Sequence, residues 1–252
     1  MATTTAKLLK DNPWCCFCGG QEKAATTDHQ PARIFFPDKH RPKGFEFSAC
    51  SVCNRQTSGD EALVGLIARM TGNHRPDTDP DSGIGKAAAA VERCFPNLIR
   101  QITTKTLVNQ NGTMVPVVTV DANNPQVETS ACKVAAKLAL ATYYHKRGAI
   151  VPETARINTM WTHNQNPHGA PGVTQILSLL PEAEYLKQGR DWDTHSTFFV
   201  RYYGEGDDFY MVAIFHESVA LLAHVVGNKD ATTWQKWYRV WAPKRAAGLE
   251  MV

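Results

Sequence analysis

Two pairs of cysteines are the residues of this sequence whose spacing most clearly indicates chemistry. Cys15 and Cys18 form one C-x-x-C pair, and Cys50 and Cys53 form the second. Each pair can present two thiolates to one ion, and four thiolates complete the closed tetrahedral site that is typical of structural zinc. We therefore expect a zinc ion to hold this part of the chain together and to supply much of its folding free energy.

Two alternatives for these cysteines are buried thiols and a redox pair. A redox C-x-x-C usually stands alone within a βαβ pattern, which the surrounding sequence lacks. Cys16 could replace Cys15 as a ligand, although the spacing favours Cys15. Cys94 and Cys132 fall in helical stretches, so we expect both in the hydrophobic core.

The insert between the two cysteine pairs contains titratable side chains. It contains TTDHQPARIFF at 26–36, a strand-like run that holds Asp28 and His29. A turn-rich PDKHRPKG and a second strand-like run, FEFSA, follow it. The second cysteine pair then leads through Asn54 into a helix. The expected order is knuckle, strand, loop, strand, knuckle and helix.

This arrangement resembles the zinc-stapled branch of the HNH, or ββα-metal, endonuclease family. The resemblance covers about residues 14–70 and rests on C-x-x-C with glycine, Asp-His before Pro31, and C-x-x-C-Asn before a helix. It implies a zinc-bound, treble-clef-like ββα-metal module. It also implies that His29 is the general base, and that Asp28 and Asn54 hold a catalytic Mg²⁺ or Mn²⁺ ion.

General chemistry agrees with these implied roles. A neutral histidine can accept a proton near neutral pH. Oxygen ligands from Asp28 and Asn54 would leave the rest of an octahedral shell to water and a substrate phosphate, and the ion would stabilise the departing 3′ oxygen. Arg33 on the strand and Arg55 beside Asn54 are placed to contact phosphate, and a solvated surface position is the alternative for both.

The family pattern is incomplete in this chain. The second strand, GFEFSAC, has no counterpart of the asparagine that orients the base, so a backbone carbonyl is the alternative. A later histidine ligand is missing too, and Asp60 and Glu61 are the nearest acidic residues. Because adjacent side chains in a strand point to opposite faces, Asp28 and His29 can share a site only if the chain bends after Asp28, helped by Pro31.

The remainder of the chain predicts a second domain, so that the whole is α+β. The polar TGNHRPDTDPDSG indicates a linker. We place the nuclease module at 1–70, the linker at 71–84 and an α+β domain with a small antiparallel sheet at 85–252. The second domain is expected to serve target recognition, sensing or oligomerisation.

Several segments of the second domain carry clear structural signals. An alanine-rich helix is expected after Ser82 as its N-cap, and TMVPVVTV at 113–120 predicts a strand that Pro116 confines to an edge or a bulge. The run QVETSACKVAAKLALATYYHKR predicts a largely buried helix that Gly148 ends. Three β-type runs, STFFVRYYG, DDFYMVAIFHES and VALLAHVVG, predict an antiparallel meander.

Other aromatic and basic residues allow two interpretations each. Trp234, Trp237, Tyr238 and Trp241 recur at helical spacing, which favours a helix packed on the core over a base-stacking surface. The basic loop PDKHRPKG could follow a phosphate backbone or simply be solvated. The remaining histidine motifs lack ligand spacing, so we expect structural roles for His163, His168, His216 and Glu217.

Bulk composition is that of an ordinary globular protein, with 43% hydrophobic residues and a net charge of +3. This charge tolerates a nucleic-acid partner without requiring one. The first residues do not form a secretory signal, and no apolar run reaches the length of a membrane span. We therefore expect a cytoplasmic protein without a membrane partner.

The expected function is that of a metal-dependent endonuclease acting on nucleic acid, with DNA as the expected substrate, in a phage, restriction or defence setting. The alternative is a zinc-dependent nucleic-acid-binding module without catalysis. One base and one ion suit cleavage of a single strand, so cleavage of both strands would need a homodimer. A regulatory partner is the other expected assembly.

Overall fold

The computed structural model of this chain describes residues 4–36, 45–72, 81–152, 155–163, 176–181, 197–206, 208–227 and 239–241, with short pieces at 184, 187–188 and 192–193.

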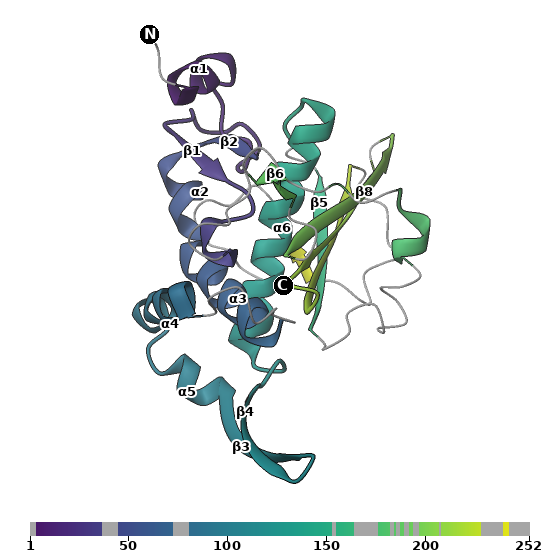
Figure 1. The fold of residues 1–252 in the computed structure, drawn as a ribbon. Coiled ribbons are helices and arrows are strands. Elements are labelled where there is room, and N and C mark those ends of the chain that lie inside the picture. Colours follow the sequence, from purple (N-terminus) through teal and green to yellow (C-terminus); the bar gives the residue numbers. More distant parts are fainter. Residues whose placement is uncertain are drawn as a thin grey trace.

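The N-terminal part consists of a short hairpin with helices after it (Figure 1). Helix α1 (Thr4–Asp11) precedes strand β1 (Thr26–His29), the 3-10 helix η1 (Arg33–Phe35) and strand β2 (Glu46–Ala49). Helices α2 (Ser51–Gln56) and α3 (Ser58–Thr71) follow directly. Strands β1 and β2 pair antiparallel, with Thr26 opposite Ala49 and His29 opposite Glu46. The expected order of strand, strand and helix is confirmed.

The first strand is shorter than the sequence predicts. β1 ends at His29, and Pro31, which has no N–H to donate to a strand ladder, follows in the turn. Arg33 therefore begins the 3-10 helix η1, and its predicted place on the strand is wrong. The basic loop PDKHRPKG lies outside the described residues.

The middle of the chain begins with helix α4 (Asp81–Cys94) and helix α5 (Leu98–Ile102). Ser82 lies inside α4 rather than at its N-cap, and Cys94 is exposed, so both predictions are wrong. The predicted burial of Cys132 is confirmed.

A separate hairpin follows α5. Strands β3 (Thr103–Gln110) and β4 (Thr113–Val120) pair only with each other among the described residues, and Pro116 lies opposite Leu107. In a sheet of two strands each strand is an edge, so the prediction for Pro116 is confirmed.

Helix α6 (Pro125–Arg147) is the long helix that the sequence predicts. Asn124 caps its first turn by accepting a hydrogen bond from the backbone N–H of Gln126 at 3.0 Å. Gly148 ends the helix in the left-handed conformation, with φ of 62°. Its alanine-rich middle is buried, as predicted.

The C-terminal part forms an antiparallel sheet in the order β11-β5-β10-β9-β8. Its strands are β5 (Arg156–His163), β8 (Phe198–Glu205), β9 (Asp208–Phe215), β10 (Val219–Val226) and β11 (Arg239–Trp241). Strands β6 (Lys187–Gln188) and β7 (Trp192–Asp193) form a separate two-stranded sheet. The predicted meander is confirmed by β8, β9 and β10. The helix predicted around the aromatic stripe is wrong at Trp241, which lies in β11. The other residues of the stripe, Trp234, Trp237 and Tyr238, fall outside the described part of the chain.

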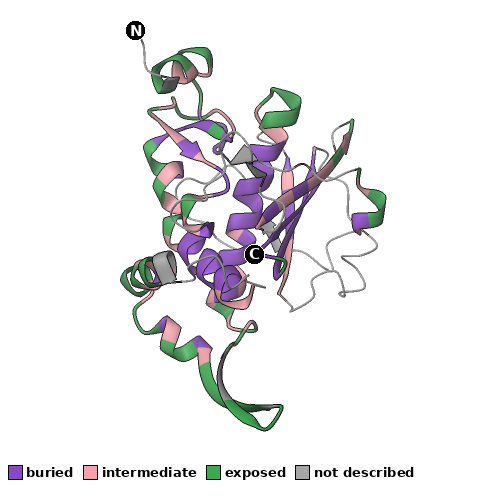
Figure 2. Cartoon of the chain, viewed as in Figure 1, coloured by how far each residue is buried: buried purple, intermediate pink, exposed green. Residues whose placement is uncertain are grey.

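Helix α6 lies at the centre of the fold, between α3 on one side and the sheet on the other (Figure 1). The burial map shows the same layering, with buried residues concentrated along α3, α6 and the facing strands (Figure 2). One hydrophobic core joins Phe47 and Leu63 to Leu138 and Phe215. The α+β class and the small antiparallel sheet are thus confirmed, and both predicted domains contribute to this core.

No helix in the described segments combines the length and the apolar composition that crossing a bilayer requires.

Candidate functional site

The four predicted cysteine ligands come together at one point. Cys15 and Cys18 lie in the turn before β1, while Cys50 caps α2 and Cys53 lies in its first turn. All four are buried, and their sulfur atoms lie within 4.8 Å of one another. Tetrahedral zinc, with Zn–S bonds of about 2.3 Å, needs sulfurs about 3.8 Å apart. The cluster could therefore bind a metal such as zinc.

The thiols of this cluster perturb one another strongly. The pKa of Cys18 is lowered, chiefly because it accepts a hydrogen bond from the Cys15 thiol. The pKa of Cys53 is raised, chiefly through its interaction with Cys15. Without a cation the cluster therefore stabilises one thiolate at the expense of the others, whereas a divalent metal stabilises all four. Cys16 is buried nearby but is not one of the clustered ligands, which favours Cys15 over Cys16 as predicted.

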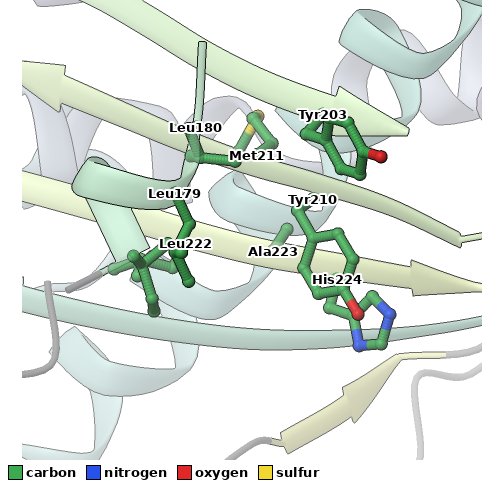
Figure 3. A pocket seen from close by; sticks show the side chains of 9 residues that line it. Leu179, Leu180, Tyr203, Tyr210, Met211, Leu222, Ala223 and His224 are labelled. Carbon is green, nitrogen blue, oxygen red and sulfur yellow. The ribbon is translucent and has the colours of Figure 1, made fainter. Parts of the chain in front are cut away.

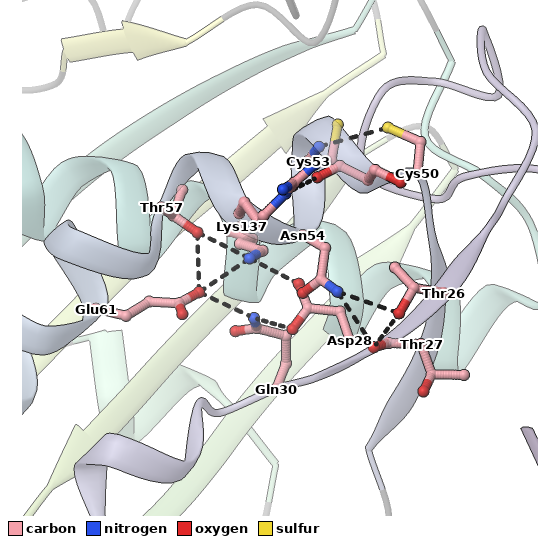
Figure 4. A network of polar contacts seen from close by, with 12 residues as sticks. Thr26, Thr27, Asp28, Gln30, Cys50, Cys53, Asn54, Thr57, Glu61 and Lys137 are labelled. Atoms are coloured by element: carbon pink, nitrogen blue, oxygen red, sulfur yellow. Dashed lines mark hydrogen bonds and ion pairs between the residues drawn. The ribbon is translucent and has the colours of Figure 1, made fainter.

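Asp28, the predicted magnesium ligand, points into the interior and binds a lysine. Its Oδ2 lies 2.7 Å from Nζ of Lys137, which reaches it from α6 (Figure 4). The same Nζ donates to Thr57 Oγ1 at 2.8 Å and to Glu61 Oε1 at 3.0 Å. Lys137 is 2% exposed, so this ammonium is surrounded by oxygen atoms inside the protein.

The acidic residues at the start of α3 are both buried and paired. Gln30 donates from Nε2 to Glu61 Oε1 at 3.2 Å and to Asp28 Oδ1 at 3.5 Å, linking the two carboxylates. Burial raises the pKa of Glu61 despite the attraction of Lys137. Burial alone would lower the pKa of Lys137, but attraction to Glu61 and Asp28 outweighs it and raises that pKa.

Asp60 lies beside this cluster and contacts a different part of α6. Its Oδ1 accepts a hydrogen bond from Ser130 Oγ at 2.7 Å, and its Oδ2 lies 3.6 Å from Lys133 Nζ. Asp60 and Glu61 therefore join α3 to α6, and their suggested role as further magnesium ligands has no support in these contacts.

His29 lies on the other side of the strand from Asp28. Its Nδ1 is 3.4 Å from Oε1 of Glu46, the residue directly opposite on β2, and its side chain is 34% exposed. The bend expected after Asp28 is not seen, because both residues pair with β2 in continuous register. Glu46 was missed in the sequence, although the antiparallel register of two four-residue strands would have placed it there.

Asn54 contacts the beginning of β1. Its Nδ2 donates to Thr26 Oγ1 at 3.3 Å and to the carbonyl of Thr27 at 3.5 Å. The two predicted phosphate contacts, Arg33 and Arg55, are both exposed, and Arg55 donates to the carbonyl of Ser51 at 3.2 Å. The structure thus brings Asn54 beside the strand that carries Asp28 and His29.

The residues around Asp28 do not fit Mg²⁺ as they are arranged. Mg²⁺ requires six ligands at about 2.0–2.1 Å and keeps several waters. The Asp28 carboxylate is instead 7% exposed and bound to an ammonium, which would repel a divalent ion at the same oxygen. Of the two predicted magnesium ligands, Asn54 is the one that does not belong to the cluster around Lys137.

A cavity of about 300 Å³ lies far from these residues in the fold, on the C-terminal sheet (Figure 3). Leu179, Leu180 and Met211 contribute apolar walls, and Tyr210 stacks on His224 at 4.1 Å. None of the predicted catalytic residues lines it.

Comparison with known proteins gives no match: no family profile, no curated protein and no solved structure matches this chain.

Proposed function

We propose that this protein is an HNH-type endonuclease that hydrolyses phosphodiester bonds of nucleic acid, with DNA as its substrate. The observation that carries the proposal is the pair of His29 and Glu46 on a hairpin whose ends are fixed by four clustered cysteines. A histidine that is partly exposed and held by a carboxylate is suited to proton transfer at a surface site.

The proposed chemistry follows from the two nitrogens of the imidazole. A proton on Nδ1 directed at Glu46 leaves Nε2 as the basic nitrogen. Nε2 takes a proton from the water that attacks the phosphorus, and the Glu46 carboxylate stabilises the imidazolium that forms. As the new P–O bond forms, the bond from phosphorus to the 3′ oxygen breaks, and the departing oxygen takes a proton from solvent. Arg33 and Arg55, both exposed, are the proposed contacts to the phosphate backbone. In this proposal zinc is structural and needs the reducing surroundings of the cytoplasm to keep its ligands as thiolates.

The resemblance to HNH enzymes also implies Mg²⁺ or Mn²⁺, which when bound would stabilise charge on the departing 3′ oxygen. Asn54 is the candidate protein ligand, because Asp28 is bound to Lys137. The proposal therefore derives no step from an ion held by Asp28.

The test is cleavage of supercoiled plasmid by the zinc-loaded protein, with Mg²⁺ or Mn²⁺ and with EDTA. We expect nicking by the wild type and a loss of about 10²- to 10⁴-fold in His29→Ala, the range that a general base contributes. His163→Ala is the matched control, because His163 is a partly buried histidine on strand β5 of the other sheet. Equal cleavage by His29→Ala and the control would refute the assignment of the base.

The second candidate is a zinc-dependent nucleic-acid-binding module without catalysis. The observation that favours it is Lys137, which occupies the position beside Asp28 where the family resemblance implies a metal ion. This candidate predicts no cleavage by the wild type and a DNA gel shift that persists in His29→Ala. A gel shift reduced in Arg33→Ala and Arg55→Ala would locate the surface that binds.

A further inference from the structure

We infer that Lys137 fills a latent divalent-cation site, and that removing its side chain creates a metal-binding site made by Asp28, Thr57 and Glu61. The inference concerns the buried cluster itself and stands independently of the proposed hydrolysis.

The oxygen atoms around Lys137 are of the kind that bind a divalent cation. Three oxygen atoms surround Nζ of Lys137: Asp28 Oδ2 at 2.7 Å, Thr57 Oγ1 at 2.8 Å and Glu61 Oε1 at 3.0 Å. They come from β1, from the junction of α2 and α3, and from α3 itself. Carboxylate and hydroxyl oxygens are hard ligands that Mg²⁺ and Mn²⁺ accept. These three oxygen atoms, the oxygen cage, therefore surround the Lys137 ammonium group as they would surround a metal ion.

The charge of the cluster also suits a divalent cation. Two carboxylates face one ammonium in this cluster, so its formal charge is −1 when all three groups are ionised. Truncating Lys137 would leave two carboxylates without their cation inside the protein, which is costly. A divalent ion would compensate both charges. Gln30, which donates to both Asp28 and Glu61, would hold the two carboxylates together in the variant.

The Lys137 side chain takes up enough buried volume to make room for an ion. Lys137 is 2% exposed, so its removal vacates the volume of its side chain next to the cage. That volume can admit the ion together with waters that complete its coordination shell, as Mg²⁺ and Mn²⁺ require. The neighbouring lysine of α6, Lys133, has a side chain that is 25% exposed and pairs with Asp60 instead, so its removal builds no such cage.

The experiment measures Mn²⁺ binding by calorimetry and by electron paramagnetic resonance on the zinc-loaded full chain. We expect Lys137→Ala to bind one Mn²⁺ per chain more than the wild type, and the double variant Lys137→Ala/Glu61→Gln to lose that ion. Lys133→Ala is the matched control and should bind no additional Mn²⁺. In thermal unfolding, Mn²⁺ should raise the Tm of Lys137→Ala. It should change the Tm of Lys133→Ala only as much as it changes the Tm of the wild type.

Because Lys137→Ala could fail to fold without metal, Lys137→Ser provides a second variant whose short side chain leaves the site open and whose hydroxyl can donate to one of the carboxylates. Refolding of Lys137→Ala on addition of Mn²⁺ would support the inference. A folded Lys137→Ala or Lys137→Ser that binds no more Mn²⁺ than the wild type would overturn it. Wild-type binding of Mn²⁺ that is abolished by Asp28→Asn would also overturn it, because the cage would then be open to a metal despite Lys137.

Discussion

At the scale of single residues, Asp28 and His29 show how one strand can serve two purposes. Adjacent side chains of β1 face opposite sides, so Asp28 meets Lys137 in the interior while His29 meets Glu46 near the surface. The family resemblance treats both as parts of one catalytic site. The contacts instead give Asp28 a role in holding β1 against α6, and leave His29 with Glu46 as the exposed pair.

The proposed role of Glu46 predicts the phenotype of Glu46→Gln. A glutamine keeps the shape but not the charge that orients the imidazole, so kcat should fall by about 10²-fold while KM changes little. Glu46→Asp should recover part of the loss because it restores the carboxylate. Rates of plasmid nicking over a range of substrate concentrations separate the two constants.

The control for this prediction is Glu184→Gln. Glu184 also lies near a histidine, with its Oε1 3.6 Å from Nε2 of His145, but it is outside the hairpin. If Glu46→Gln and Glu184→Gln have the same small effect on kcat, Glu46 does not position the base.

The buried ammonium predicts a large effect on stability. Lys137→Met leaves Asp28 and Glu61 without their cation, so we expect a loss of about 3–5 kcal/mol in the free energy of unfolding. Lys133→Met, whose side chain is 25% exposed, should cost about 1 kcal/mol or less. Urea unfolding at pH 8 measures both, and similar losses in the two variants would contradict the role given to Lys137.

The sign of the pH dependence follows from the raised pKa of Lys137. Its pKa in the folded protein lies above the ordinary value of 10.5, so its contribution is complete below pH 10.5 and is lost as the pH rises through the folded pKa. The gap in stability between wild type and Lys137→Met should therefore narrow only above pH 10.5. A gap that is already closed at pH 9 would show that Lys137 is not charged in the folded state.

These residues also mark what the sequence could and could not predict. The clustering of the four cysteines was predictable because the C-x-x-C spacing is a local sequence pattern that brings two sulfur atoms close together. Lys137 was not, because ACKVAAKLALA predicts a buried helix and says nothing of which distant carboxylate will receive its lysine. Its one signal was its position as the single charged residue of VAAKLALA, at 134–141. A buried lysine requires acidic partners.

At the scale of elements, α6 is the part that the sequence describes best. Its start at Asn124 and its end at Gly148 depend on local chemistry, namely a side-chain cap and a left-handed residue. Its alanines allow close packing between α3 and the sheet. The pairing of β1 with β2 was also predictable, whereas the end of β1 before Arg33 was misjudged because strand propensity was extended past Pro31.

The helix ends give a prediction with an internal control. Gly148→Ala forces a residue with a Cβ into φ of 62°, which should lower the free energy of unfolding by about 1–2 kcal/mol. The added Cβ has no atom within 4 Å, so no new contact would offset this loss. Gly85→Ala places the same methyl group in open space inside α4, where it should stabilise by about 0.5–1 kcal/mol. Thermal or urea unfolding of the two variants measures the difference. Equal effects at both positions would show that the left-handed end of α6 is not maintained in solution.

At the scale of the whole molecule, the described parts of 1–70 and 85–252 share one core. Phe35 of the N-terminal part stacks on Phe215 of β9 at 4.3 Å, and His216 Nε2 lies 2.6 Å from the carbonyl of Phe35. The domain boundary predicted at 71–84 depends on a change in composition. Composition carries no information on tertiary contacts between the segments on either side. Most of the intervening linker, 73–80, lies outside the described residues.

The shared core predicts that metal removal affects both parts. Binding of structural zinc supplies about 10–16 kcal/mol in small zinc modules, which is comparable with the whole stability of an ordinary domain. Because the cysteine cluster, α3 and the sheet belong to one core, a chelator should unfold the hairpin of β1 and β2 and also accelerate hydrogen exchange in β9 and β10. Mass spectrometry of amide exchange, with and without chelator, resolves the two regions. Re-addition of zinc should restore protection in both, as a test of reversibility. If β9 and β10 keep their protection while the hairpin loses its own, residues 85–252 form an independent domain, as the sequence predicts. The contacts of Phe35 and Lys137 would then be too weak to couple that domain to the hairpin of β1 and β2.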